Sequence, residues 1–504
     1  MNSTVPRSAT RSASRRSCHV ASGTMTSPAS GMSIAPAGSR LSSCQLSAST
    51  RRFRISFAID VFLECVVTEA VNHLDEAFGL AVAMLEIALD QPLDDVRHVG
   101  PRERRTDRLA ERRLDRTGVR LALVATDLDL VPLLVMLIHA EDADVADVVV
   151  AAGIDAAIDA LREGRTRYSH MAGLPDLRVA LSRKFSEENH IAYAPEEILV
   201  TSGAKQAVFT ALLALLDPGD EVVIPSPYWV TYPEAVRLIG GIPVIAQTRF
   251  ENGFKLTPEE LRKAITPKSK LLILNSPCNP TGAVYSRAEL EALAAVIVEK
   301  DLYVLSDEIY EHILFGDTQV VSLAALSPAM RERTATVNGF SKAFAMQGLR
   351  LGYIGAPASW AKAMIATQSH AAHHPSTISQ YAALGCLNAS KEILPAIKPH
   401  YQKTRDYTLS RLKKIPGVAW NDPQGAFYVF LSVQALLPSR VGTRKIEGSL
   451  ALAEYLLEKH NLATVPGIGF GCEGYLRLSF ANALADLEKA LDRLEQGLRA
   501  LTPG

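Results

Sequence analysis

Residues 303–342 decide the fold, because two short apolar runs in this stretch each end in a polar turn. The first reads YVLSDEIY at 303–310, and the second reads TATVNGFSK at 334–342. Each run is followed by residues that favour a turn, which predicts a buried strand. Asp307 comes directly after the first strand and Lys342 shortly after the second. In open α/β sheets functional groups gather beyond the carboxyl ends of the strands, so these two turns are the first candidates for a site.

From about residue 151 onward, short apolar strands, polar turns and amphipathic helices alternate strictly along the sequence. This alternation is typical of an α/β protein with a mainly parallel sheet. Strands are expected at 198–201, 221–224, 271–274, 303–305, 334–337 and 352–354. Helices are expected between them, for example at 205–216 and 287–299.

Composition excludes several classes of protein. The 504 residues are 48% hydrophobic, enough for a large core and two or three domains. The 53 Lys and Arg nearly balance the 54 Asp and Glu, so no nucleic-acid or membrane-surface partner is expected. The six cysteines form no CxxC pair, which favours a reducing, cytoplasmic location over organellar import. The apolar stretch at 55–89 is broken by acidic residues and predicts no membrane span.

The first 150 residues have a different character. Residues 1–55 are rich in Ser, Ala and Arg and precede the first acidic residue, Asp60, which indicates a disordered or targeting-like arm. Residues 56–150 form an atypical extension of uncertain fold. Its basic run at 102–113 has no interleaved aromatic residues, so a solvated helix face is favoured over a nucleic-acid patch.

Two further strand ends carry groups that suit a ligand. The turn TSGAK at 201–205 opens a helix, and backbone N–H groups at a helix N-terminus attract a phosphate. Small residues open many helices, so this turn alone is a weak signal, and the spacing of a P-loop is absent. Trp229 follows the strand at 221–224 and could stack on a planar ring, although packing is the commoner role of a partly buried Trp.

The other strand ends add complementary chemistry. The rigid turn NSPCNPTG at 275–282 presents the amide of Asn279. A buried Asp307 needs a cationic partner, and a protonated ring nitrogen would serve and lower its pKa. Lys342 at a dry strand end could lose its proton and form a Schiff base with an aldehyde, and Arg350 could hold a phosphate. A single Lys beside a Ser is usually a surface residue, so the hypothesis depends on five strand ends contributing to one site.

These turns together resemble fold type I pyridoxal-phosphate enzymes, and specifically the class I and II aminotransferases of the aspartate aminotransferase family. The resemblance covers about residues 151–501. The matching stretches are RY at 167–168, SGAKQ at 202–206, SPYW at 226–229, NPTG at 279–282, SDEIY at 306–310, SKAFAM at 341–346, LRLGY at 349–353, PQGAFY at 423–428 and RLSF at 477–480. The resemblance implies a large domain at 151–395, with a mainly parallel sheet flanked by helices, and a smaller α+β C-terminal domain at 396–504.

The resemblance also implies pyridoxal 5'-phosphate as cofactor and assigns its catalytic contacts. Lys342 would hold the cofactor covalently and move the proton during turnover. Asp307 would pair with the pyridine nitrogen, while Asn279 and Tyr310 would bond the phenolic oxygen. Trp229 would stack on the ring.

The remaining contacts implied by the resemblance concern the phosphate and the substrate. The phosphate ligands would be the backbone of Gly203, Ala204 and Lys205, the side chains of Ser341 and Arg350, and Tyr168 reaching over from a second subunit. The last of these implies a homodimer. Arg477 and Asn279 would take the substrate α-carboxylate beside Trp229. Lys205 would take a distal carboxylate, although a solvated lysine is the alternative.

The resemblance therefore predicts an aminotransferase with ping-pong kinetics and no metal. It would move the amino group of aspartate, or of another dicarboxylic or aromatic amino acid, to a 2-oxo acid such as 2-oxoglutarate. Three alternatives stay open. One is a lyase or decarboxylase of the same fold, the second is an aminotransferase-like sensor domain of a transcription regulator, and the third is a catalytically dead fragment.

The chain departs from the family pattern in three places. Gln347 stands where many relatives have Thr, and the histidine-containing loop at 368–374 replaces a Ser/Thr/Asn-rich one. Residues 1–150 do not resemble the family, and the turn that closes over the substrate has no counterpart there. Two explanations fit: a fused extension that replaces the first small-domain segment, or a coding region assigned a wrong start or frame.

Overall fold

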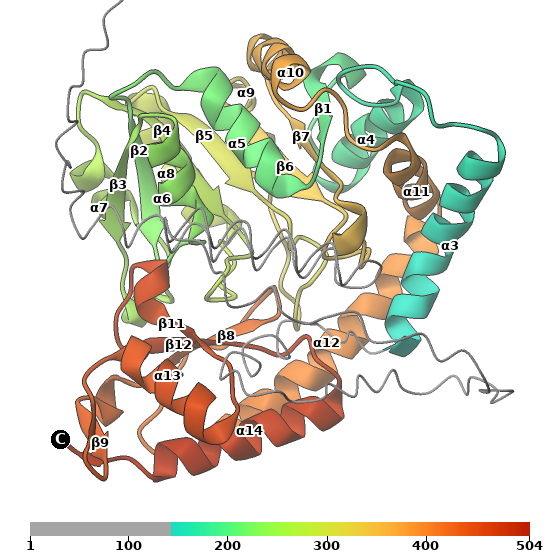
Figure 1. Cartoon of the computed structure of the whole chain (residues 1–504). Helices are drawn as coiled ribbons and strands as arrows, with labels where there is room; N and C mark the ends of the chain where they lie inside the picture. Colours follow the sequence, from blue (N-terminus) through green and yellow to red (C-terminus); the bar gives the residue numbers. More distant parts are fainter. Residues whose placement is uncertain (1–142) are drawn as a thin grey trace, which may run out of the picture. The chain divides into compact units, whose positions relative to one another are not determined.

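The computed structural model describes residues 143–504, and all of them belong to one compact unit of the chain (Figure 1). The predicted arm at 1–55 and the basic run at 102–113 lie outside the described residues, as does the predicted extension up to residue 142. The first described element is helix α3 (Ala143–Arg162), which crosses the domain boundary predicted after residue 150.

A seven-stranded sheet forms the centre of the described region. Its strands are β1 (Ile198–Thr201), β2 (Glu221–Ser226), β3 (Ile242–Gln247), β4 (Ser269–Asn275), β5 (Tyr303–Asp307), β6 (Thr334–Gly339) and β7 (Gly352–Gly355). Their order is β1-β7-β6-β5-β4-β2-β3. Only β7 runs antiparallel to its neighbours, β1 and β6. The predicted α/β class with a mainly parallel sheet is therefore confirmed.

Each of the six predicted strands is present, and the sequence reading missed only β3 of this sheet. That strand, IPVIAQ, lies at the sheet edge, and Ala246 is its one buried residue. Proline is tolerated at sheet edges, and weak burial leaves no clear alternation of apolar and polar residues. Two parallel neighbouring strands need a long crossover connection, usually an α-helix. The connection between β6 and β7 contains only turns and a 3-10 helix, which accounts for the antiparallel direction of β7.

Helices cover both faces of this sheet. They include α4 (Pro175–Glu188), α5 (Ala204–Leu215), α6 (Thr231–Leu238), α7 (Pro258–Ala264), α8 (Arg287–Glu299), α9 (Pro328–Arg331), α10 (Ala358–Ala371) and α11 (Thr377–Asn388). In β4, Leu271 and Ile273 pack in one core with α5 and α10, whereas Leu272 and Leu274 pack in another with α8. This alternation follows from the two-residue period of a strand, and each fully buried Leu stabilises the fold by roughly 1.5–3 kcal/mol.

Local signals explain where the helices begin. The predicted helix at 287–299 coincides with α8. Its N-terminus is a capping box, in which Ser286 Oγ accepts a hydrogen bond from Glu289 N (3.4 Å) and Glu289 Oε2 accepts one from Ser286 N (2.8 Å). Both orphan N–H groups are satisfied by this exchange, so the helix starts at one defined residue.

The C-terminal part of the chain builds two small antiparallel sheets. One contains β11 (Val465–Pro466), β12 (Tyr475–Ser479) and β8 (Tyr428–Ser432), and the other β10 (Arg444–Ile446), β9 (Ser439–Val441) and β13 (Thr502–Pro503). Helices α12 (Ser390–Leu412), α13 (Ser449–His460) and α14 (Leu484–Arg499) contribute to their core (Figure 1). The domain boundary predicted at 395/396 falls inside α12, so one continuous helix crosses it.

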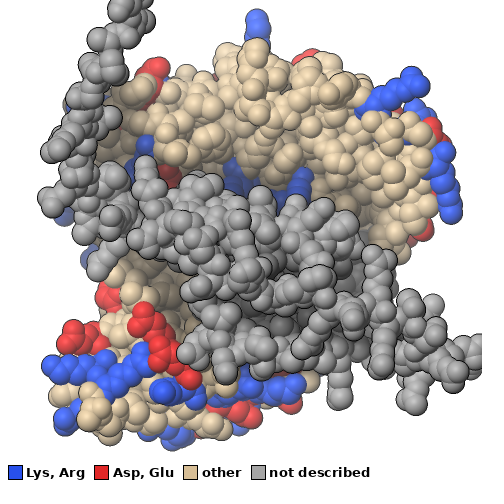
Figure 2. All heavy atoms as spheres, viewed as in Figure 1, with Lys and Arg blue, Asp and Glu red and all other residues tan. Residues whose placement is uncertain are grey.

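The surface of these C-terminal helices carries charges of both signs. Arg411 pairs with Asp492 (2.5 Å) and Arg444 with Glu458 (2.6 Å). Figure 2 shows Lys and Arg side by side with Asp and Glu over this region, in keeping with the balanced charge of the sequence. Among the helices of residues 143–504, none combines the length and the apolar character that a membrane span requires.

A network of buried polar side chains is attached to the turns that follow β5 and β6, with Glu311 at its centre. Glu311 accepts hydrogen bonds from Lys184 of α4, from Asn189 (2.5 Å) and from Asn338 of β6 (2.6 Å). Burial alone would raise its pKa, but the charges of Lys184 and His312 outweigh burial and hold the pKa of Glu311 well below its ordinary value. The ionised carboxylate therefore ties α4 to the end of β6.

Glu188, Glu311 and His312 place ligand-type atoms within 4.8 Å of one another, a spacing that a metal ion could use. The ammonium group of Lys184 lies among them, bonded to Glu311 and 3.6 Å from Glu188. A lysine cation thus already neutralises these carboxylates, and the cluster gives no ground for proposing a metal.

Glu308 extends the same network but is in a different state. Its carboxyl oxygens accept hydrogen bonds from Ser306 Oγ (2.8 Å) and Ser322 Oγ (2.5 Å). Burial raises the pKa of Glu308 to about 7, because the nearby charge of Glu311 adds to burial and the two serine hydrogen bonds only partly oppose it. Glu308 therefore takes up a proton at mildly acidic pH, while Glu311 stays ionised.

The Glu311→Gln variant should unfold more easily, because it leaves the buried ammonium of Lys184 without its carboxylate. We expect a loss of about 3–5 kcal/mol in the free energy of unfolding, measured by denaturant titration. Glu332→Gln is the matched control, since Glu332 pairs with Arg331 at the surface with 65% of its side chain exposed. It should lose at most about 1 kcal/mol. Equal losses in the two variants would contradict the stabilising role assigned to Glu311.

The Glu308→Gln variant should change how stability depends on pH. In the folded chain the pKa of Glu308 lies above its unfolded value of 4.5, so wild-type stability falls as pH rises from about 4.5 to about 7. Glutamine stays neutral at these pH values, so the variant does not lose this part of the free energy of unfolding as the pH rises. The variant should gain on the order of 2–3 kcal/mol over wild type at pH 8 and nothing at pH 4.5. Denaturant titrations at both pH values test this, and a difference that does not change with pH would contradict it.

Candidate active site

The central strands bring the candidate residues to one edge of the sheet. Asn275, Asp307 and Val337 lie in register at the ends of β4, β5 and β6. The turns that follow these parallel strands therefore start side by side. Lys342 Nζ lies 5.9 Å from the ring centroid of Tyr310, which follows Asp307 by three residues in the turn after β5. Asp307 and Lys342 accordingly belong to one site.

Asp307 is a deeply buried carboxylate, with 3% of its surface exposed. One oxygen accepts a hydrogen bond from the hydroxyl of Tyr232 (2.7 Å), and the other accepts one from Ile309 N (3.3 Å). Burial raises the pKa of Asp307, and these bonds together with the charge of Lys342 offset it only in part. A cation beside this carboxylate would favour its ionised form.

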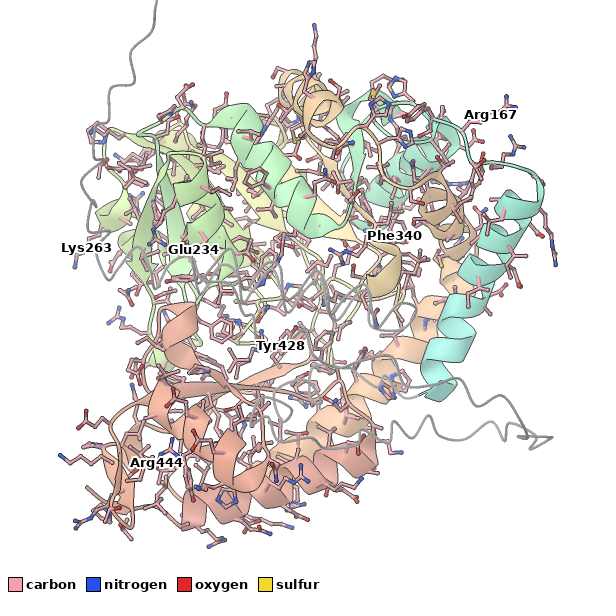
Figure 3. The ribbon with its side chains drawn as sticks, viewed as in Figure 1. Arg167, Glu234, Lys263, Phe340, Tyr428 and Arg444 are labelled. Atoms are coloured by element: carbon pink, nitrogen blue, oxygen red, sulfur yellow. The ribbon has the colours of Figure 1, made fainter. Side chains whose placement is uncertain are left out.

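Lys342 lies in the turn after β6, between aromatic rings. Its Nζ is 5.9 Å from the ring centroid of Tyr310 and 5.5 Å from that of Phe427. Phe340 and Phe344 are buried on either side of Lys342 in the sequence and anchor the turn; Phe340 is labelled in Figure 3. Ser341, next to Lys342, is half-buried in the same turn.

The N-terminus of α5 forms an anion-attracting end of the site. Gly203 caps the helix with φ 87°, and a Cβ on it would lie 2.8 Å from Nη2 of Arg350. A Cβ on Gly352 would lie 2.4 Å from Ala204 N, so glycine there lets β7 approach the start of the helix. A guanidinium group and a helix N-terminus thus converge, and both attract phosphate.

Trp229 and Lys205 lie between this end and Asp307. The Nζ of Lys205 is 5.4 Å from the ring centroid of Trp229. The Trp229 ring packs edge to face against Tyr232 at 5.3 Å, and Tyr232 is the residue that bonds Asp307. Trp229 is therefore one side chain away from the buried carboxylate.

The opposite end of the site joins the small sheet to the large one. Arg477 of β12 donates a hydrogen bond from Nη1 to Asn279 Oδ1 (3.0 Å). Its guanidinium lies 4.5 Å from the ring centroid of Tyr428 and 5.1 Å from that of Phe470. The hydroxyl of Tyr428 is 3.1 Å from that of Tyr310, whose pKa burial raises well above the ordinary value. Tyr310 therefore keeps its proton.

Tyr168 is placed apart from these residues. Its surface is 87% exposed, and its ring packs edge-on against His373 (5.0 Å) and His374 (5.7 Å). These histidines follow the end of α10, and the loop predicted at 368–374 is wrong for residues 368–371, which belong to that helix. His374 Nε2 accepts a hydrogen bond from Ser169 N (3.0 Å). Tyr168 is thus presented at the surface of its own chain, and its contact with a second subunit stays a prediction.

The sequence reading missed three residues that support the site. Tyr232 bonds Asp307, Asn275 donates from Nδ2 to the Asp307 carbonyl (2.9 Å), and Tyr428 contacts Tyr310. Each stands within or next to a quoted motif: Tyr232 lies three residues after Trp229, Asn275 opens the NSPCNPTG turn, and Tyr428 closes PQGAFY. Position in a motif could have flagged these residues, but their partners are 32 to 118 residues away in the chain.

Comparison with known proteins gives the same result over the same part of the chain. A family model described as aminotransferase class I and II matches residues 140–494. The chain is 41% identical to the probable aspartate/prephenate aminotransferase of Aquifex aeolicus, over 69% of this chain and 87% of that protein. It is 44% identical to the bifunctional aspartate aminotransferase and glutamate/aspartate-prephenate aminotransferase of Petunia hybrida, over 69% of this chain and 74% of that protein.

Solved structures agree. The aspartate aminotransferase of Rhizobium meliloti is 40% identical with a TM-score of 0.68, and that of Thermus thermophilus, solved with maleate, is 43% identical with a TM-score of 0.65. Each comparison covers 69% of this chain and 88% of the other. With the geometry above, these matches show that the chain belongs to the aminotransferase class I and II family.

Proposed function

We propose that this chain is a pyridoxal 5'-phosphate-dependent aspartate aminotransferase that passes the amino group to a 2-oxo acid such as 2-oxoglutarate. The observation that carries the proposal is the shared site of Lys342 and Asp307, bounded by Arg350 at one end and Arg477 at the other. The family depends on pyridoxal phosphate in general. Relatives named aspartate and aspartate/prephenate aminotransferases favour a dicarboxylic substrate.

The donor set fits the cofactor in three places. The N-terminus of α5 and Arg350 suit its phosphate, together with Ser341. The carboxylate of Asp307, whose ionised form burial disfavours, suits a protonated ring nitrogen. Trp229 suits the ring face, while the protonated hydroxyl of Tyr310 and the amide of Asn279 suit the phenolic oxygen.

When bound, pyridoxal phosphate supplies an electron sink for the substrate's electrons. Asp307 keeps the ring nitrogen protonated, which that role requires. Lys342 would hold the cofactor through Nζ. Once free, its amine would take the proton from the substrate's α carbon as general base and later give it up as general acid. Departure of the oxo acid before the second substrate binds gives ping-pong kinetics.

Substrate recognition would use the two cationic side chains at the site. Arg477, held by Asn279, offers a planar fork for the α-carboxylate beside Trp229. Lys205, which lies over the Trp229 ring, would take the distal carboxylate of aspartate. Two carboxylates on one small substrate would account for the use of both Lys205 and Arg477.

A homodimer is part of the proposal. Tyr168 is a large aromatic residue with 87% of its surface exposed, and it is held next to the histidine-containing loop. Exposure of this extent suits a side chain that completes the phosphate site of a second copy.

The comparisons do not favour the alternative functions. The relatives described above carry aminotransferase names, which argues against a lyase, a decarboxylase or a regulator. A DNA-binding domain of a regulator would have to lie in the first 80 or so residues, outside the described part of the chain.

The Lys342→Ala variant should lose covalent attachment of the cofactor and the internal base. We expect aspartate transamination to fall by at least about 10²–10⁴-fold. Attachment is measured by adding pyridoxal phosphate, reducing with borohydride and locating the added mass by peptide mass spectrometry. In wild type and in the control Lys263→Ala, a lysine exposed on α7, the mass should lie on the peptide that contains Lys342 (Figure 3). Attachment to another lysine in wild type would overturn the assignment of Lys342.

The Lys205→Ala variant should lose preference for dicarboxylic substrates. Removal of a charge-assisted hydrogen bond should lower kcat/KM for aspartate by about 10- to 100-fold and leave that for phenylalanine within about twofold. Steady-state kinetics with both amino acids measure the ratio. Lys263→Ala again serves as the control and should change neither value. An equal loss for both substrates would indicate a structural role for Lys205.

A further inference from the structure

Tyr428 contacts two residues of the candidate reaction centre, and no role has been assigned to it. It is the first residue of β8 and 5% exposed. Its hydroxyl lies 3.1 Å from the hydroxyl of Tyr310, and its ring lies 4.5 Å from the guanidinium of Arg477. Figure 3 labels Tyr428 where the small sheet meets the loops of the large one. One side chain therefore contacts both Tyr310 and Arg477.

Strand register explains how Tyr428 reaches Arg477. In the antiparallel pair β8 and β12, Tyr428 faces Ser479 and Phe430 faces Arg477. Tyr428 and Arg477 are thus diagonal neighbours on the same face of the small sheet. Diagonal pairs lie within reach of aromatic and long side chains, so the ring of Tyr428 is fixed against the guanidinium by the backbone itself.

The contact with Tyr310 crosses from the small sheet to the large one. Tyr310 follows β5 and is 4% exposed, and its ring packs at right angles to Tyr428 at 5.9 Å. The hydrogen bond between the two hydroxyls contributes to the raised pKa of Tyr310, after burial. The Tyr428 hydroxyl therefore fixes the position of the Tyr310 hydroxyl, whichever of the two oxygens donates.

We propose that Tyr428 is a positioning residue that couples the carboxylate-binding Arg477 to Tyr310. Its ring orients the guanidinium, and its hydroxyl orients the phenol that faces the cofactor. The proposal rests on the proposed function, because it takes Arg477 and Tyr310 in the roles given above. The two contacts use different atoms of one side chain, so substitutions can separate them.

Tyr428→Phe removes only the hydroxyl. In the cofactor-loaded protein, we expect the pH midpoint of the cofactor's absorbance band to move by roughly 0.4 to 1 pH unit, in the same direction as in Tyr310→Phe. The dissociation constant for succinate, an unreactive dicarboxylate measured by calorimetry, should stay within about twofold. The kcat for aspartate should fall while KM changes little.

Tyr428→Leu removes the ring as well. Loss of the cation–π contact with Arg477 should weaken succinate binding by about 2- to 30-fold and raise KM for aspartate by a similar factor. Phe470→Leu removes the second ring beside Arg477 and keeps this test possible should Tyr428→Leu fail to fold. It should weaken succinate binding without moving the absorbance midpoint.

Tyr475→Phe is the matched control for the hydroxyl. Tyr475 is a buried tyrosine on β12, and its ring stacks on Phe430 at 4.8 Å. Tyr475→Phe should leave both the absorbance midpoint and the dissociation constant for succinate unchanged. This control separates the effect of the Tyr428 hydroxyl from a general effect of removing a buried tyrosine hydroxyl. Thermal denaturation of every variant separates loss of folding from loss of coupling.

The outcomes distinguish a failure of the proposed function from a failure of the role proposed for Tyr428. A wild-type chain that binds no pyridoxal phosphate would overturn the proposed function, and this inference with it. A wild type that titrates normally, together with a Tyr428→Phe variant whose midpoint equals that of wild type, would overturn the inference alone. Succinate affinity unchanged in a folded Tyr428→Leu variant would also overturn it.

Discussion

The rest of the site depends on the burial of one carboxylate, Asp307, at the end of a central strand. An ionised carboxyl away from water is costly unless a cation or hydrogen-bond donors compensate it. Tyr232, the backbone of Ile309 and the charge of Lys342 compensate it in part, and its pKa is still raised. A binding partner with a positive charge would complete this environment. The requirement explains why the anion-binding turn, the lysine and the aromatic residues gather at this edge of the sheet.

Glu308 and Glu311, the two other acidic residues of this segment, differ in their protonation. The side-chain carboxyl of Glu308 accepts hydrogen bonds from two serine hydroxyl groups, and burial raises its pKa to about 7. Glu311 lies beside Lys184 and stays ionised. Three acidic residues within five positions therefore differ in charge state because the turn presents them to different neighbours. Through Asn338, the network holds the end of β6 and supports the turn that carries Lys342.

The substrate end of the site is assembled across two sheets. Arg477 meets Asn279, and Tyr428 meets Tyr310, so each contact pairs the small sheet with a loop of the large one. The small sheet is thus part of the reaction centre and not only a covering layer. The antiparallel register of β8 and β12 fixes which rings lie under the guanidinium, and this gives the C-terminal region its functional role.

The sequence alone determined the fold class and six of the seven strands of the large sheet, and it predicted the residues of the candidate site. It could do so because strand periodicity and the turns after each strand are local signals. The weakly alternating edge strand β3 and the antiparallel course of β7 needed the structure, because both depend on neighbouring strands. So did the partners of Tyr232, Glu311 and Tyr428. Their contacts with Asp307, Lys184 and Tyr310 join residues 75 to 127 positions apart, and only the packed chain brings such residues together.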